Sequence, residues 1–188
     1  MGSQDVDQAM AAMMRALTPH LIRDWNVPAG RLEWSCWQTA AHVAHDLMAY
    51  AGQLTARPAN AYLPFDLTVR QGTPPRDVLE VVAASGGLLS SAVRTADPQA
   101  RGWHWGPTDP AGFAALGVNE ILMHTHDIAE GLEVTWQPPS ALCAAVLQRL
   151  FPDAPAGNPV EVLLWCTGRA PLNDRPRRTT WILKAAVD

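Results

Sequence analysis

The stretch from Ser35 to Ala56 most strongly restricts the fold of this chain. Ser35 and Gln38 form a capping-box pattern, in which a hydroxyl and an amide satisfy free backbone N–H groups at a helix start. Pro58 follows the stretch and favours its termination. A helix this long with an apolar stripe has to pack against other helices, so it predicts a bundle. The stripe recurs at helical spacing through Ala40, Val43, Ala44, Leu47, Met48, Ala51 and Leu54.

Most of the remaining chain is also helical in pattern, and no internal repeat or domain linker interrupts it. We therefore expect residues 1–188 to form one domain, a mostly α four-helix bundle with a short C-terminal extension of helix and strand. The Gly86–Gly87 pair, in the middle of one helix, indicates close contact with a neighbouring helix. Residues 102–107 are expected to form a loop. Further helices are expected at 5–17, 73–96, 109–132, 140–151 and 158–168, and short strands at 67–70 and 179–184.

Composition and charge exclude several classes of protein. The 188 residues are enough to bury a core without a disulfide or a structural metal, so any metal is expected to serve chemistry. A net charge of −4 gives no basic footprint for nucleic acid. No apolar run reaches the roughly 18 residues of a membrane span, and no signal-peptide pattern is visible. We expect a cytoplasmic protein without nucleic-acid or membrane partners.

Two other groups of residues have plain structural explanations. Three widely spaced cysteines, Cys36, Cys143 and Cys166, form neither a disulfide framework nor a cysteine-rich zinc site, and we expect them to be packing residues in a reducing compartment. The basic residues cluster once, close to two prolines. A solvated surface loop explains this cluster better than an anion site. Its members are Arg169, Arg175, Arg177 and Arg178.

The strongest chemical signal is Glu120 followed four residues later by His124. Side chains at this spacing on a helix lie side by side, with Cβ atoms roughly 5–6 Å apart. His42, on the helix of residues 35–56, offers a third donor. Two imidazoles and one carboxylate are the type and number of ligands that a catalytic divalent metal takes, with one position left open. Because apolar residues flank Glu120, its carboxylate is costly to bury unless it is paired or bound to a metal.

The neighbouring polar residues differ in which way they point. At about 100° per residue, His124 and Asp127 lie at about 40° and −20° from Glu120, whereas His126 lies at about 240°. His126 is therefore a poor ligand candidate, and Asp127 is an expected hydrogen-bond partner of a metal-bound histidine. His45 lies within one turn of His42 and stays open as a replacement or additional ligand.

Two motifs carry a family resemblance. Trp34-Ser35-Cys36-Trp37 through His42-Val43-Ala44, together with Asn119 to Ala129, resemble the DinB-like superfamily, and most closely the N-terminal domain type of mycothiol-dependent maleylpyruvate isomerases. The segment Leu163 to Arg169 is similar to the tail of small actinobacterial members. The resemblance implies a four-helix bundle with a divalent metal held by His42, Glu120 and His124. Zinc is the first choice, with nickel, iron or manganese as alternatives.

The resemblance implies metal-dependent chemistry with a small thiol such as mycothiol, for S-transfer to or isomerisation of a small organic substrate. The isomerases carry a second domain where this chain has a short extension, which argues against maleylpyruvate isomerisation itself. His45 beside Asp46 also departs from many relatives. A second hypothesis keeps the metal without the thiol, as an isomerase, cyclase or hydrolase of a natural-product pathway with His45, His104 and Asp127 as acid–base candidates. A third is a non-catalytic ligand-binding or stress-response protein, and a homodimer fits all three.

Overall fold

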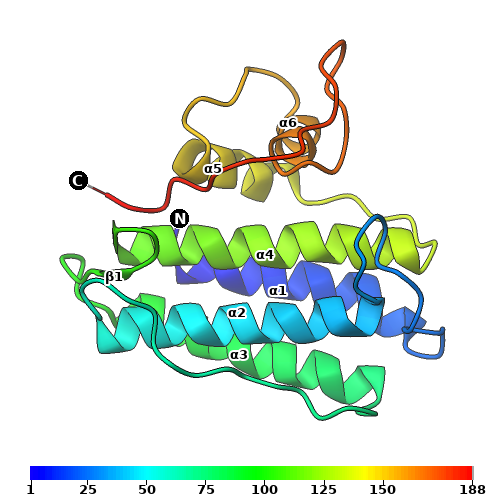
Figure 1. Cartoon of the computed structure of the whole chain (residues 1–188), viewed down its shortest axis with the longest axis horizontal. Coiled ribbons are helices and arrows are strands. Elements are labelled where there is room, and N and C mark those ends of the chain that lie inside the picture. The colour runs from blue at the N-terminus through cyan, green and yellow to red at the C-terminus, as the bar shows by residue number, and fades with distance from the viewer. Residues whose placement is uncertain (188) are drawn as a thin grey trace.

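The computed structural model describes residues 1–187, in which four long helices run side by side and two shorter ones lie beyond α4 (Figure 1). This arrangement confirms the predicted mostly α fold built on a four-helix bundle. A 3₁₀ turn, η1 (Thr18–His20), follows the first helix. The helices are α1 (Ser3–Leu17), α2 (Cys36–Ala56), α3 (Pro75–Thr95), α4 (Pro110–Gly131), α5 (Ser140–Leu150) and α6 (Pro159–Cys166).

Side-chain caps determine where several helices begin. The Ser35 hydroxyl accepts the backbone N–H of Gln38 at 3.1 Å, and the Gln38 amide oxygen accepts the Ser35 N–H at 2.9 Å. The predicted capping box of α2 is therefore present. Asp109 caps α4 by accepting a first-turn N–H at 2.7 Å, and Asn158 caps α6 in the same way at 3.0 Å. These bonds satisfy donors that a helix start otherwise leaves unpaired.

α4 lies at the centre of the molecule. It packs against α1, α2 and α3 within the bundle and against α5 on its other side. Residues 112–119 are accordingly all buried, as are most of the residues that follow. A helix that is enclosed on all sides carries any polar side chain into the interior, where a carboxylate or imidazole needs a partner.

The glycine pair of α3 is explained in part by close packing. A Cβ added to Gly86 would lie 2.7 Å from the Met10 sulfur of α1, so this glycine permits a close contact, as predicted. A Cβ at Gly87 would meet nothing within 4 Å. The prediction is thus correct for the first glycine, while nothing in the structure explains the second.

The predicted strands are wrong. Residues 67–70 form no strand, and the backbone N–H of Leu67 donates to His45 Nδ1 at 3.1 Å instead. Residues 179–184 form no strand either, and the backbone N–H of Lys184 donates to the Leu150 carbonyl at the end of α5. A ladder occurs instead within the predicted loop, where β1 (Gly102–Trp103) pairs antiparallel with β2 (Pro107–Thr108). An alternating pattern makes a strand only where a partner strand lies beside it.

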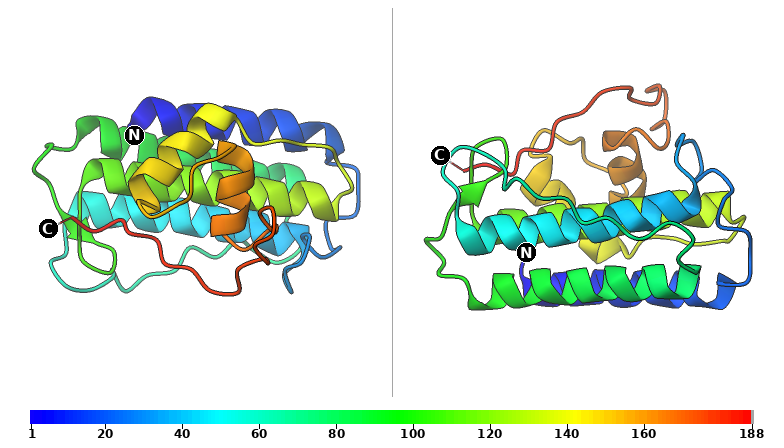
Figure 2. Two further views of the ribbon diagram at one scale, coloured as in Figure 1. Left: turned by 90° about the horizontal axis from the view of Figure 1, so that it is seen from above. Right: turned by 60° about the horizontal axis from the view of Figure 1, so that its bottom comes forward.

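The chain after α6 returns along the outside of the bundle towards the β1–β2 turn (Figure 2). There Ala186 forms an isolated bridge with Thr108. This return places the C-terminal segment over the α4 side of the bundle.

α3 departs from the expectation that no segment is apolar enough to span a membrane. By length and composition alone, α3 could span a membrane, since its most apolar window has a mean hydropathy of 1.2. Within the fold, 44% of that window is buried. α3 packs against α1, α2 and α4, and this packing accounts for its apolar face.

Candidate metal site

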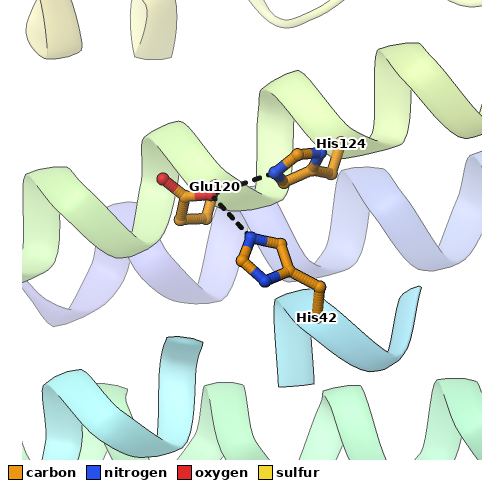
Figure 3. A group of neighbouring side chains, drawn as sticks. All are labelled: His42, Glu120 and His124. Atoms are coloured by element: carbon orange, nitrogen blue, oxygen red, sulfur yellow. Dashed lines mark ion pairs between the residues drawn. The ribbon is translucent and has the colours of Figure 1, made fainter. Parts of the chain in front are cut away.

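Three potential metal ligands converge between α2 and α4 (Figure 3). Glu120 and His124 project from adjacent turns of α4, and His42 faces them from α2. Glu120 Oε2 lies 3.1 Å from His124 Nε2 and 3.8 Å from His42 Nε2. The three donor atoms all lie within 4.8 Å of one another. The residues that the sequence pattern singled out as a ligand set therefore do come together in the fold.

A carboxylate fixes the orientation of the His124 ring. Asp127 Oδ2 lies 3.0 Å from His124 Nδ1, one helical turn further along α4. When Nδ1 carries the proton and donates to Asp127, the lone pair of Nε2 points towards Glu120 and His42. Metal-binding histidines commonly have this outer carboxylate partner, which sets the tautomer. Asp127 thus occupies the position that its place on the helix predicted.

Burial and neighbouring charges shift the pKa values of the two imidazoles in opposite directions. Burial, with the nearby His124, lowers the pKa of His42 to about 4, so that this ring is neutral at neutral pH. Burial alone would also lower the pKa of His124, but its hydrogen bonds to Asp127 and Glu120 outweigh burial and raise the pKa to about 9. Without a metal, the protonated His124 therefore lies between the two carboxylates and offsets part of their negative charge. A divalent cation has to displace this proton when it binds.

The Glu120 carboxylate stays charged although its side chain is only 12% exposed. Burial alone would raise its pKa, but the hydrogen bond from His124, with the nearby His42 and Arg169, brings the pKa below its ordinary value. An anionic oxygen beside two imidazole nitrogens is a suitable ligand set for a divalent metal.

Asp46 is a residue of this site that sequence reasoning left without a role. Its Oδ2 lies 3.4 Å from His42 Nε2, on the side of the ring that faces Glu120. Burial, together with the Glu120 charge, raises the pKa of Asp46 to about 7. The signal was present in the sequence, because His42 and Asp46 are four residues apart on one helix face.

The other candidate histidines lie outside the ligand cluster. His45 Nδ1 accepts the backbone N–H of Leu67, so the ring is engaged with the loop after α2. His104 is buried between Tyr50 and Tyr62, with ring centroids 5.7 and 6.0 Å away. Neither histidine lines the pocket beside His42.

The ligand cluster opens into a pocket of about 300 Å³. Trp34 and Trp181 flank the pocket and are 44% and 40% exposed, so each leaves part of its indole free for a bound molecule. A larger cavity of about 830 Å³ lies near the starts of α2 and α3 but contains none of the three ligand side chains. The smaller pocket is therefore the one with the means for metal chemistry.

The basic cluster does not behave as one solvated loop. Arg169 reaches the interior, where its Nη2 donates to Asp127 Oδ2 at 2.7 Å and its Nε to Oδ1 at 3.2 Å. The Arg169 side chain is only 13% exposed. Arg175 and Arg177 are exposed, as predicted, although Arg177 donates to the Gly168 carbonyl. The sequence interpretation is thus wrong for Arg169.

The cysteines are placed as packing residues. Cys36, Cys143 and Cys166 are all free and buried. Burial raises the pKa of Cys36 to about 11 and that of Cys143 to about 12, and it also raises the pKa of Cys166. A thiol held in this neutral form is a poor nucleophile.

A sequence comparison identifies the relatives of this bundle. The mycothiol maleylpyruvate isomerase N-terminal domain matches residues 4–129, about two thirds of the chain. The chain belongs to this family. Mycothiol maleylpyruvate isomerase N-terminal domains are part of the DinB-like superfamily, as the motifs predicted. No curated protein and no solved structure matches the chain.

The matched span covers nearly all of α1 to α4 and contains every member of the ligand cluster. In this member of the mycothiol maleylpyruvate isomerase N-terminal domain family, later residues complete the pocket. Glu130, Thr167, Gly168, Arg169, Arg177, Trp181 and Leu183 line it from beyond the match. Glu130 lies at the end of α4, whereas the other six lie after α6, where the sequence pattern did not predict the path of the chain.

Proposed function

We propose that the protein is a metal-dependent enzyme that activates a small thiol of the mycothiol type, for S-transfer to or isomerisation of a small organic substrate. The observation that carries the proposal is the convergence of His42, Glu120 and His124 beside an open pocket. The family name, which refers to mycothiol, supports the choice of thiol.

The side chains present fit a divalent metal in number, type and protonation. Two imidazole nitrogens and one carboxylate form the same kind of donor set as known catalytic zinc sites, which leave a position for substrate. His42 is neutral at neutral pH, and Asp127 holds the His124 ring with Nε2 facing Glu120. A bound divalent metal supplies a Lewis acid that keeps a coordinated thiol deprotonated at neutral pH. Zinc is our first choice of metal.

The chain's own residues carry the remaining tasks. The exposed parts of the Trp34 and Trp181 indoles offer apolar surface to the body of a thiol or substrate. No protein cysteine lies in this pocket, so the reactive sulfur has to arrive with a small molecule. The thiol-independent alternative gains little support, because His45 and His104 do not line the pocket and Asp127 is already paired.

Elemental analysis and a thiol-consumption assay test this proposal together. Purified untagged protein is expected to contain about one divalent metal per chain and to accelerate the reaction of mycothiol with a model electrophile. Because His42→Ala removes one of three ligands, it should lose metal and rate together. His126→Ala is the matched control, since His126 lies on α4 but outside the ligand cluster. Full thiol activity in metal-free His42→Ala protein would refute the mechanism.

A further inference from the structure

Arg169 joins the segment after α6 to the ligand cluster. It donates through Nε and Nη2 to the two oxygens of Asp127, at 3.2 and 2.7 Å. The same Asp127 Oδ2 faces His124 Nδ1 at 3.0 Å. The resulting chain of contacts runs from Arg169 through Asp127 to His124 and then to Glu120.

The two-pronged contact restrains the Asp127 carboxylate. A guanidinium that donates to both oxygens restricts rotation of the carboxylate as well as its position, which one contact alone would not do. The Asp127 side chain is 4% exposed, so water has little access to compete for these oxygens. The orientation of the His124 ring is therefore coupled to Arg169, although 45 residues of chain separate the two.

The turn that carries Arg169 is itself shaped to hold it. Gly168 has a φ of +73°, and a Cβ there would lie 2.6 Å from the Trp181 ring. The Arg169 guanidinium lies 5.8 Å from the centroid of the same ring, and its Nη1 donates to the Thr167 carbonyl at 2.8 Å. Contacts with Trp181 and the Thr167 carbonyl therefore help to hold the guanidinium in place beside Asp127.

We propose that Arg169 is a positioning residue of the metal site, acting through Asp127 on the orientation of His124. The C-terminal segment beyond residue 129 then contributes to metal binding as well as to the pocket wall. This inference rests on the proposed function, since it assumes that His124 is a ligand.

Metal affinity, measured without thiol or substrate, tests the inference. Apo protein is titrated with zinc in competition with a chromophoric chelator. Arg169→Met is expected to bind zinc about 10–100-fold more weakly than wild type, the range typical of a lost outer-shell partner. Arg169→Lys should restore part of the loss, because lysine keeps the charge but not the two-pronged contact. Arg175→Met is the matched control, as Arg175 lies over Trp165 and outside the pocket.

A double variant separates a positioning role from a general effect on stability. If Arg169 acts through Asp127, then Asp127→Asn with Arg169→Met should bind zinc no more weakly than Asp127→Asn alone. Additive losses would overturn the inference, and so would a zinc affinity of Arg169→Met and Arg169→Lys within twofold of wild type. A wild-type protein that binds no divalent metal would instead refute the proposed function, and this inference with it.

Discussion

The buried ion pair between Asp127 and Arg169 provides a quantitative test of the structure in the metal-free protein. Replacing Asp127 with Leu removes an acceptor of contacts from Arg169 Nε, Arg169 Nη2 and His124 Nδ1 at 3.2, 2.7 and 3.0 Å. The Arg169 guanidinium keeps the bond from Nη1 to the Thr167 carbonyl and its contact with the Trp181 ring, but it loses its only partner of opposite charge among the described residues. The side chains of the pair are 4% and 13% exposed, so little water can replace the lost partner.

The expected cost follows from leaving one buried charge without its partner. Such changes typically cost about 3–5 kcal/mol, whereas replacing both charges with apolar residues is often close to neutral. For a chain of this size, about 3–5 kcal/mol corresponds to a fall in melting temperature of roughly 6–20 °C. The double replacement of Asp127 with Leu and Arg169 with Met should therefore recover most of the stability that the single replacement loses.

Urea unfolding of the two variants and wild type in the presence of EDTA measures these differences. Fitting all three curves with one m-value checks that the compactness of the denatured state is unchanged. A loss below about 1 kcal/mol for the single variant would mean that the pair behaves like an exposed salt bridge. A double variant that is less stable than the single one would also refute the reasoning.

Three further predictions concern packing, pH and thiol reactivity. Gly117→Ala should lower the free energy of unfolding by about 1–3 kcal/mol, because the new Cβ would lie 2.3 Å from a Leu89 methyl carbon. Gly87→Ala is the control, because its Cβ would meet nothing within 4 Å, and thermal unfolding should show it to be neutral or stabilising. Folding raises the pKa of His124 from 6.5 to about 9. In metal-free protein, the stability that His124 contributes should therefore be fully present below about pH 6.5 and lost as pH rises towards 9. In His124→Phe, the free energy of unfolding should depend less on pH over this range. The three buried cysteines should react with a disulfide reagent only at the rate of unfolding, and fast labelling of native protein would contradict their placement.

The helical framework was accessible from the sequence because helix starts and apolar stripes are short-range patterns. The Ser35–Gln38 capping box involves residues within one turn, and both of its bonds occur where they were predicted. The spacing of Glu120 and His124 likewise fixes their common side of α4 without reference to the rest of the fold. The choice of His42 as the third donor depended on family resemblance, since no local pattern relates α2 to α4.

What packs over α4 was decided only by the tertiary structure. The composition around Arg169 predicted an exposed loop. In the structure, however, Arg169 forms an ion pair with Asp127, 42 residues earlier in the chain. The strands predicted at 67–70 and 179–184 were wrong for a related reason, since a short segment cannot specify its partner strand. A periodic pattern determines which face of an element is apolar, whereas the pairing of a buried charge depends on the group that the fold brings against it.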